Sequence, residues 1–481
     1  MRILCAALAA ILLLMTASCG GAEKADTAAG TGETSVTPAA AEEETSAPPA
    51  DYLPNSDFGG YEFHILTAAD QWYSTYSSEL TGDLIDDAVY YRNMNVEQRF
   101  GVKLVYDRFD GYSAGMSSVK EALSGSVLSG DGSYDMLVAD GYYVSDYIFD
   151  GLLSKLDGFD AFDFTQQHWL TDTIEEHRLK GGTYLAIGSI SINTIRMNIV
   201  VFCNKLMSDN LQLGDIYQPV NDGKWTVEHL TSNAVKASGD IDGDGKMGEN
   251  DRWGILGSGS DVFAPMLTGM GYRFTYTDSD GFMQLKSPDG LLTGINEKIH
   301  GLQTDKSISY VESPGNTDKK DIFDKFAAGE GLYLFYRLDT AERQMIREMD
   351  DYGIMPLPKY DEEQQGYVGS GGCDIAAVPA VVNDGNMCAV ICEALSAYGY
   401  HDVYPVYYDV VLPNKLSRDS DTAKILDMIC SGIYTDPAMT FSKILDNIYY
   451  SVGSSANISS SFEKKIAKLN ATLIKSISEL G

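Results

Sequence analysis

The chain is poor in positive charge and in histidine, and each shortage excludes a class of function. It has 35 Lys and Arg residues against 69 Asp and Glu residues, which gives a formal net charge of -34. This balance argues against a nucleic-acid partner, because phosphate backbones bind clustered positive charge. The 6 His residues form no H-E-x-x-H motif and no zinc cluster. We expect His168 and His177 to be ordinary polar residues on the surface.

Cysteine is present but lacks a pattern. Two of the 7 residues, Cys5 and Cys19, lie near the N-terminus. The remaining five are an odd number at irregular spacing, which is no disulfide framework. They are Cys203, Cys373, Cys388, Cys392 and Cys430. We expect them to be buried and unreactive.

Long apolar runs are also missing, apart from one near the N-terminus. Residues 3–15 are apolar but fall well short of the ~20 residues that span a bilayer, so residues 1–18 are typical of a signal peptide. The following Thr16-Ala17-Ser18-Cys19 resembles the lipobox of bacterial lipoproteins, which predicts lipidation of Cys19; an ordinary cleaved signal peptide is the alternative. Residues 19–52 are mostly Ala, Gly, Thr, Glu, Ser and Pro, which predicts a disordered leash about 30 Å long. We therefore expect a body anchored by lipid at the extracellular face of the cell membrane.

The rest of the chain alternates strand and helix patterns. Residues 59–68, 102–106 and 134–140 read as short apolar strands, and residues 82–100 have helical spacing that stops at a glycine. Further strand patterns follow in "NIVVFCNKLM", "RWGILGSGS", "GLYLF", "YGIMPLPKY" and "CDIAAVPAVV". Strands separated by helices indicate an α/β fold with parallel pairing. About 430 residues exceed one compact core, so two or more lobes are expected.

Several of these segments, in this order, resemble the family 1 extracellular solute-binding proteins of bacterial ABC importers, the maltose-binding-protein-like group. The segments are "GDLIDDAVYYRNMNVEQRFGVKL", "YDMLVAD" with "GLLSKLDGF", "VFCNKLM", "GKWTVEHL", the acidic loop with "RWGI", "YGIMPLPKY" and "VLPNKLSRDSDTAKILDMI". The resemblance implies a two-lobed periplasmic-binding-protein-like (type II) fold with a hinge and a ligand cleft between the lobes. It also implies a non-enzymatic, monomeric protein that captures a carbohydrate, such as an oligosaccharide, for an ABC transporter permease. Projected onto this chain, residues 53–188 and 345–400 form lobe 1, and residues 189–344 and 401–481 form lobe 2.

Aromatic and polar residues at the ends of the expected strands are the candidate ligand contacts. Tyrosine is abundant, with 30 residues, and flat rings stack on sugar faces while carboxylates and Arg bond hydroxyl groups. Such residues follow the carboxyl ends of strands, where open α/β sheets bind ligands. The candidates are Trp72, Tyr73, Asp140, Tyr142, Tyr336 and Arg337, with Asp374, Tyr407, Tyr408 and Asp409 as weaker ones.

Two other functions stay open. "GYSAG" matches G-x-S-x-G with Ser113 at the nucleophile position, but "DRFD" separates it from the apolar strand and no oxyanion segment is present, so we interpret it as a chance match. A surface-anchored glycoside hydrolase or esterase is therefore the alternative of a different class. A ligand-binding partner of a sensor kinase is a third.

The acidic segment "DIDGDGKMGEND", residues 240–251, has the spacing of a calcium loop. Asp240, Asp242 and Asp244 would supply carboxylate oxygens, Lys246 its carbonyl, and Asp251 the final ligand. Asp in place of Glu at the last position shortens its reach. We expect a structural calcium ion there, with no role in substrate binding.

Overall fold

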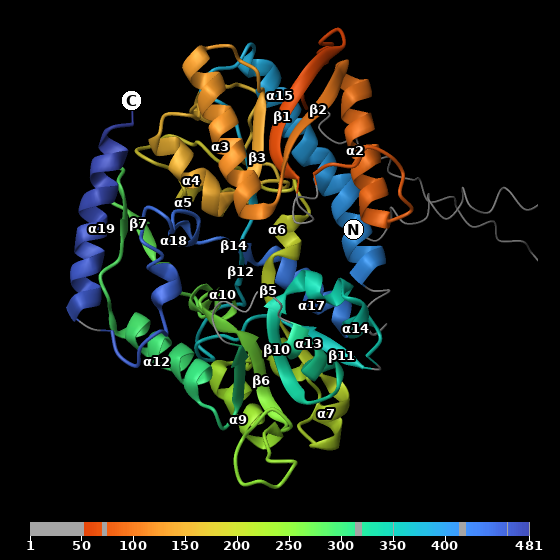
Figure 1. Cartoon of the computed structure of the whole chain (residues 1–481), viewed down its shortest axis with the longest axis vertical. Coiled ribbons are helices and arrows are strands. Elements are labelled where there is room, and N and C mark those ends of the chain that lie inside the picture. The colour runs from red at the N-terminus through yellow and green to blue at the C-terminus, as the bar shows by residue number, and fades with distance from the viewer. Residues whose placement is uncertain are drawn as a thin grey trace, which may run out of the picture. The chain divides into compact units, whose positions relative to one another are not determined.

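A computed structural model of the chain describes residues 52–69, 75–312, 320–349, 351–412, 420–458 and 460–480 (Figure 1). All of them belong to one compact unit, Pro48–Gly481. The expected signal peptide, Cys19, nearly all of the leash, Trp72 and Tyr73 lie outside the described residues. Among the described helices, none is long and apolar enough to cross a membrane.

The first sheet has the strand order β2-β1-β3-β13-β4. Strands β1, β2 and β3 pair in parallel, as the alternation of strands and helices predicts, and β13 joins β3 in antiparallel direction. The bounds are β1 Tyr61–Ala69, β2 Val102–Asp110, β3 Met136–Asp140, β4 Ala186–Ile187 and β13 Asp374–Ala377. Every residue of β3 is buried, which explains why this strand is an unbroken apolar run before its terminal Asp.

Helices α2 Leu84–Phe100, α3 Tyr112–Ser129, α4 Gly141–Phe149 and α15 Gly385–Tyr398 accompany the first sheet. Helix α2 could be predicted from the sequence because both of its ends are marked by local capping residues. The side chain of Asp83 accepts hydrogen bonds from the backbone N–H groups of Ile85 and Asp86, and Gly101 ends the helix in the left-handed region at φ 60°.

The second sheet has the order β14-β12-β5-β10-β6-β9, and β11 also pairs with β5. Its strands are β5 Asn198–Asn204, β6 Trp253–Ser258, β9 Ser309–Glu312, β10 Gly331–Arg337, β11 Tyr352–Met355, β12 Gly369–Gly371 and β14 Ile433–Tyr434. Strands β6, β9 and β10 are parallel, whereas β5 runs antiparallel to β10. A separate hairpin, β7 Thr275–Thr277 and β8 Met283–Leu285, packs against α19 Ser460–Ser478.

The other helical segments are short connections or cover the second sheet. They are η1 Leu156–Gly158, α5 Thr171–Glu176, α6 Asn193–Arg196, α7 Lys205–Asn210, α8 Gln218–Asn221, α9 Val227–Ala237, α10 Gly259–Phe263, α11 Met266–Gly269, α12 Gly290–Thr304, α13 Lys320–Ala327, η2 Leu338–Glu342, α14 Gln344–Arg347, η3 Gly399–Val403, η4 Val406–Val411, α17 Ser420–Ser431, α18 Pro437–Thr440 and η5 Tyr449–Ser451. The N-cap expected for α9 is present, because Thr226 accepts from the backbone N–H of His229.

Each sheet is the centre of one lobe, and the chain passes between the lobes at several points. It leaves β4 in the first sheet, passes through α6 and enters β5 in the second. It returns between β12 and β13 through only Gly372 and Cys373. Another crossing follows β14, since α18 packs against α4 of the first lobe. The fold is therefore the two-lobed α/β arrangement that was expected.

The crossing points differ from two of the predicted lobe boundaries. Residues 345–371 belong with the second lobe, because β11 and β12 both pair with β5. Residues 399–411, in η3 and η4, contact α2 of the first lobe and continue the direction of α15. The sequence pattern identified the strands here but carried no information on which sheet each would join.

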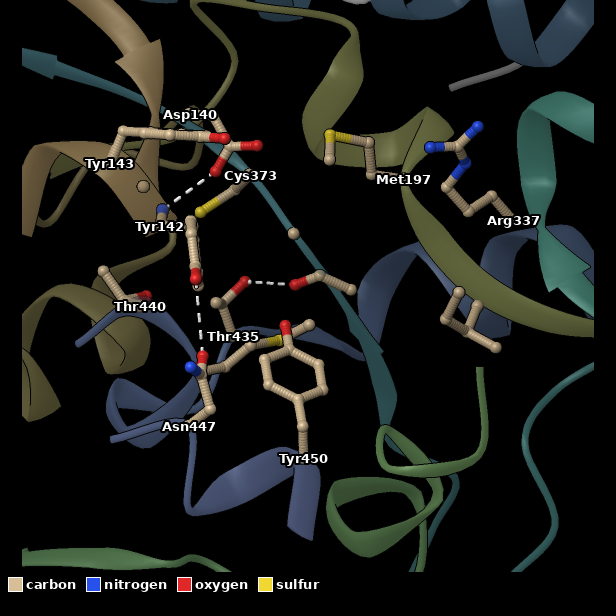
Figure 2. Close-up of a pocket in the computed structure, with 15 residues that line it drawn as sticks. Asp140, Tyr142, Tyr143, Met197, Arg337, Cys373, Thr435, Thr440, Asn447 and Tyr450 are labelled. Atoms are coloured by element: carbon tan, nitrogen blue, oxygen red, sulfur yellow. Dashed lines mark hydrogen bonds between the residues drawn. The ribbon is translucent and has the colours of Figure 1, made fainter. Parts of the chain in front are cut away.

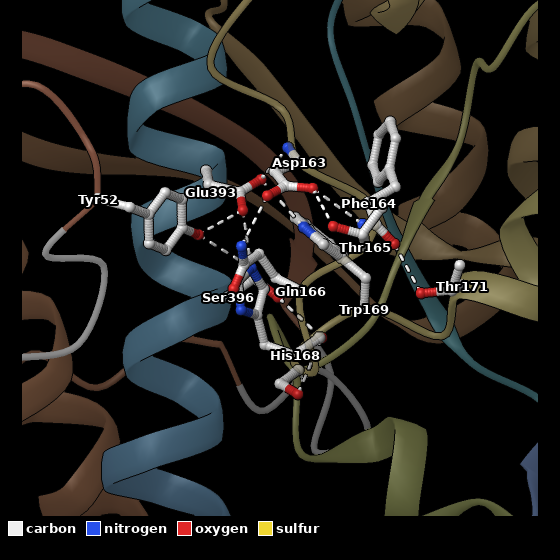
Figure 3. A network of polar contacts seen from close by, with 11 residues as sticks. Tyr52, Asp163, Phe164, Thr165, Gln166, His168, Trp169, Thr171, Glu393 and Ser396 are labelled. Carbon is white, nitrogen blue, oxygen red and sulfur yellow. Dashed lines mark hydrogen bonds and ion pairs between the residues drawn. The ribbon is translucent and has the colours of Figure 1, made fainter. Parts of the chain in front are cut away.

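A buried polar group lies where the described chain begins (Figure 3). Glu393 on α15 is 0% exposed, and its carboxylate accepts hydrogen bonds from Tyr52 Oη at 2.5 Å and Trp169 Nε1 at 3.0 Å. His168 Nε2 lies 2.9 Å from the same carboxylate. His168 is thus buried, and the prediction of a surface residue was wrong. A buried carboxylate needs such hydrogen-bond partners. The sequence around His168 did not predict that this side chain would face a buried glutamate.

The five described cysteines are free thiols, as expected. Four of them are buried, and Cys430 is half-buried. Burial raises the pKa of the Cys373 and Cys430 thiols to about 12, so these two carry little thiolate at neutral pH.

Candidate ligand-binding site

A cavity of about 510 Å³ lies where the two lobes meet at their crossings. Figure 2 shows side chains from both sheets and from the chain after β14 around it. Its lining is Asp140, Gly141, Tyr142, Tyr143, Met197, Ile199, Arg337, Gly371, Gly372, Cys373, Thr435, Met439, Thr440, Asn447 and Tyr450. The volume is within the range of small-molecule sites.

The first wall is the junction of β3 and α4. Asp140 ends the parallel strand β3 and caps α4, and its carboxylate accepts a hydrogen bond from the Tyr142 N–H at 2.8 Å. This places a carboxylate and the positive end of a helix at the carboxyl end of a parallel strand. Tyr142 and Tyr143 follow at once, with ring centroids 5.2 Å apart in an edge-to-face arrangement. The wall therefore offers aromatic surface beside a carboxylate.

The floor is the crossing between β12 and β13. A Cβ on Gly371 would lie 2.2 Å from the Met197 carbonyl oxygen, and one on Gly372 would lie 2.8 Å from Met197 Cε. Two crossing segments thus pass closer here than any side chain would allow. Gly371 of "GSGGCD" is required by this approach of two backbones.

The third wall comes from the chain after β14. Thr435 Oγ1 donates to the Gly371 carbonyl at 3.0 Å and so joins two crossings (Figure 2). Thr440 Oγ1 lies 2.9 Å from His177 Nε2, while His177 Nδ1 lies 2.7 Å from the Thr173 carbonyl. Because that carbonyl only accepts, Nδ1 carries the ring proton and Thr440 donates to Nε2.

His177 is 3% exposed, so the prediction of a surface residue was wrong for it as well. Burial lowers the pKa of His177 to about 4, which keeps the ring neutral at physiological pH. Thr173 is only four residues before His177, whereas Thr440 is distant in the chain and reaches the ring only through tertiary structure.

Arg337 brings positive charge to the cavity from the end of β10. Its Nη2 lies 3.4 Å from Asp339 Oδ2. Burial raises the pKa of Asp339, and the neighbouring Arg337 opposes that rise. The cavity lining thus combines one carboxylate, one guanidinium, hydroxyl groups and an amide, which suits a polar, largely uncharged ligand.

Three of the predicted contacts, Asp140, Tyr142 and Arg337, line this cavity. Asp374 is adjacent but buried behind it, where its Oδ2 accepts from Ser191 Oγ at 2.6 Å and Asn193 Nδ2 at 3.0 Å. Burial, together with the charge of Asp140, raises the pKa of Asp374 to about 7. Asp374 therefore links two crossings of the chain.

The other described candidates do not line the cavity. The Tyr336 ring packs edge-to-face on Phe323 at 4.9 Å, because neighbouring residues of a strand point to opposite faces and Arg337 takes the cavity side. Tyr407 is 0% exposed and donates to Glu342 Oε1 at 2.8 Å. Tyr408 and Asp409 lie beside it in η4, which contacts α2.

The sequence did not predict any residue of the third wall, and it predicted only one of the three tyrosines of the cavity. Tyr143, Met197, Thr435, Met439, Thr440, Asn447 and Tyr450 line the cavity without having been predicted. Tyr143 could have been found, since it follows the same strand as Tyr142. The residues after β14 carry no local signal, because that segment reaches the cavity through a crossing.

Ser113 lies in the first turn of α3, and β2 runs up to Asp110, so "DRFD" is part of the strand and does not interrupt it. The strand–turn–helix context is thus closer to a nucleophile elbow than expected. Ser113 Oγ, however, lies 2.9 Å from Tyr143 Oη, and no histidine is hydrogen-bonded to it within the described residues. His64 pairs instead with Asp107 at 2.8 Å. In the part of the chain that the structure describes, no histidine base is in place to activate this serine.

The acidic loop brings the side chains of Asp240, Asp242 and Asp244 together, with one carboxylate oxygen of each within 4.8 Å of the others. Asp251 is not part of this group, and its two oxygens accept hydrogen bonds from the Ile241 N–H at 2.7 Å and the Gly248 N–H at 2.6 Å. These donors lower the pKa of Asp251. The structure gathers three of the five predicted ligands, and calcium binding stays a prediction.

No protein-family model and no curated protein matches the chain in sequence. Solved structures do match in fold. The galacto-N-biose/lacto-N-biose I-binding protein of an ABC transporter from Bifidobacterium longum, in complex with lacto-N-biose, aligns with a TM-score of 0.56 at 12% identity, over 89% of this chain and 99% of that one. The chain has the fold of ABC-transporter substrate-binding proteins.

Two further proteins with this substrate-binding fold show its range. An ABC substrate-binding protein from Listeria monocytogenes, in complex with cycloalternan, has a TM-score of 0.53 at 13% identity, covering 87% of this chain and 99% of that one. UgpB from Mycobacterium tuberculosis, in complex with glycerophosphocholine, has a TM-score of 0.50 at 14% identity, covering 87% and 99%. At such identities the likeness establishes the fold.

Proposed function

We propose that this chain is the substrate-binding lipoprotein of an ABC importer, a family 1 solute-binding protein that captures a carbohydrate between its lobes and delivers it to a permease. The observation that carries the proposal is the position of the cavity. It is lined by strand ends of both lobes and by the segments that connect them. A ligand there contacts both lobes, so it favours a closed state over an open one by the contacts that only the closed state makes.

The chemistry of the cavity supports a carbohydrate ligand. Tyr142, Tyr143 and Tyr450 supply aromatic surface, while Asp140 and Asn447 supply an acceptor and an amide. Sugars present apolar ring faces and rows of hydroxyl groups, which these side chains match. Solved proteins with this fold bind lacto-N-biose and cycloalternan, which supports the same class of ligand here.

Transport by capture and release requires no catalytic group, and we propose that the chain is not an enzyme. The exposed Ser113 without a histidine partner supports this view over an esterase. The lipidated Cys19 and the leash would hold the protein at the extracellular face of the membrane, close to its permease. In this proposal the protein acts as a monomer and has no nucleic-acid partner. Calcium in the acidic loop would have a structural role.

Calorimetry on the full mature chain tests the proposal. The panel is lacto-N-biose, cycloalternan, maltotriose, glucose and glycerophosphocholine. We expect micromolar or tighter binding of at least one saccharide, with no hydrolysis detectable by chromatography after overnight incubation. Binding of glycerophosphocholine alone would contradict the carbohydrate assignment, and turnover of any saccharide would contradict the transport assignment.

A further inference from the structure

The turn before Tyr449 has an unusual backbone. Asp446 and Asn447 have φ values of 49° and 50°, two consecutive residues in the left-handed region. Residues other than glycine enter this region as single residues, with Asn and Asp the most tolerant. Among the described residues, the other non-glycine positions with positive φ are Lys180, which precedes a glycine that also has positive φ, and Gln212; neither lines the cavity.

Packing on both sides holds this conformation. Leu445 and Ile448 are each 0% exposed and anchor the two ends of the turn. The Asn447 N–H donates to the Ser442 carbonyl at 2.7 Å, and Lys465 Nζ donates to the Asp446 carbonyl at 3.0 Å. A strained backbone persists only where its surroundings fix it, and such positions concentrate at ligand sites.

Both residues of this left-handed pair are exposed, but only Asn447 lines the cavity. Asp446 is exposed and forms a 3.0 Å ion pair with Lys465, outside the cavity. Asn447 lines the cavity, and its Oδ1 accepts a hydrogen bond of 3.4 Å from Tyr142 Oη (Figure 2). That bond spans two lining segments, 305 residues apart in the chain. It uses one acceptor position of the amide oxygen, and none of the hydrogen bonds among the described residues uses Asn447 Nδ2.

We propose that Asn447 is a specificity-determining residue of the binding site, whose Nδ2 donates to a hydroxyl or ring oxygen of the bound saccharide. The left-handed turn places Asn447 in the cavity lining, where its amide oxygen accepts from Tyr142 and its Nδ2 is left to a ligand. This inference rests on the proposed function and goes beyond it, because it requires a hydrogen-bond acceptor on the ligand at this point. Asp140 nearby requires a donor, so the two side chains together select a pattern of hydroxyl groups.

The test compares Asn447→Gly with Asp446→Gly as its matched control. Glycine adopts the left-handed region freely, so both variants keep the turn. We expect similar melting temperatures for the two variants, and a Kd for the tightest-binding saccharide of the panel that rises roughly tenfold for Asn447→Gly only. A monodeoxy series of that saccharide adds a second readout. One deoxy position should weaken binding to the natural chain and have no further effect on Asn447→Gly.

The outcomes separate the two proposals. Equal Kd values for Asn447→Gly and the natural chain would overturn the role of Asn447 and leave carbohydrate binding intact. Equal losses in both glycine variants would assign the effect to the backbone of the turn and would also overturn it. If the natural chain binds no saccharide of the panel, the proposed function fails, and the role of Asn447 fails with it.

Discussion

The acidic loop and the interlobe cavity both present carboxylate groups, but the chain builds the two regions in opposite ways. In the loop, the Gly243 and Gly245 N–H groups donate to Asp240, five residues away at most. In the cavity, residues from positions 140, 337 and 447 meet across two sheets. A local arrangement can be read from spacing alone. A cavity of distant segments depends on crossings that bring backbones into contact, and it should therefore be the more sensitive of the two to small changes.

The largest contrast is expected from adding a methyl group to the backbone in each region. In Gly371→Ala the new Cβ would lie 2.2 Å from the Met197 carbonyl oxygen, so the two crossings must separate. We expect a loss of about 4 kcal/mol in the free energy of unfolding. Gly243→Ala meets nothing within 4 Å, and only its φ of 75° opposes the change, at a cost of about 1 kcal/mol. Urea denaturation measures both, and equal losses would contradict the contrast.

The second-largest effect is expected from protonation of Asp374, which lies behind the cavity. The pKa of Asp374 is raised to about 7 in the folded chain, whereas the carboxyl of the unfolded chain titrates near its model value of 3.8. The folded state therefore holds an extra proton between these values, and stability falls as pH rises from about 4 to about 7. Asp374→Asn removes that dependence. Between pH 4.5 and pH 8 the free energy of unfolding of the natural chain should therefore fall by about 3 kcal/mol more than that of the variant.

Denaturant unfolding at the two pH values measures this difference. A control is needed for His177, because its protonation also changes stability in this pH range. Its pKa is lowered to about 4, so the unfolded state binds the extra proton between pH 4 and 6.5, and stability rises with pH there. His177→Gln in the same experiment isolates that opposite slope. A pH profile of Asp374→Asn parallel to that of the natural chain would show that Asp374 ionises normally.

How far the sequence predicted each region follows from the same contrast. Helix α2 was predictable because Asp83 and Gly101 signal its ends locally. Asp140, Tyr142 and Arg337 line the cavity because they follow strand ends, where open α/β sheets form their clefts. Tyr336 does not line it, and the sequence pattern did not say which of two adjacent strand residues faces the core. Asn447 and Thr440 were missed because no local feature tells that the chain after β14 returns to the first lobe.

Calcium should stabilise the loop without touching the cavity. If Asp240, Asp242 and Asp244 hold the ion, calcium at roughly thirty times its Kd should add about 2 kcal/mol to the free energy of unfolding. A chelator should remove that increment and leave the saccharide Kd unchanged. Asp240→Asn is the matched variant, since its shape is kept and its charge is lost. If calcium does not change the melting temperature, the loop is a turn that binds no ion. If the saccharide Kd changes, the loop and the cavity are coupled.

The smallest effect concerns the aromatic surface of the cavity. Tyr142→Ala removes a ring beside Asp140 and the hydrogen bond to Asn447, and we expect the saccharide Kd to rise about tenfold. Tyr276→Ala is the control, because that ring is 44% exposed on β7 and does not line the cavity. Calorimetry should show no change for the control. Since Tyr142 is half-buried, its loss should cost little stability, so a fall in affinity together with an unchanged melting temperature would locate the ligand at the α4 wall. An unchanged affinity for Tyr142→Ala would place the sugar elsewhere in the cavity, against the opposite wall formed by Arg337 and Met197.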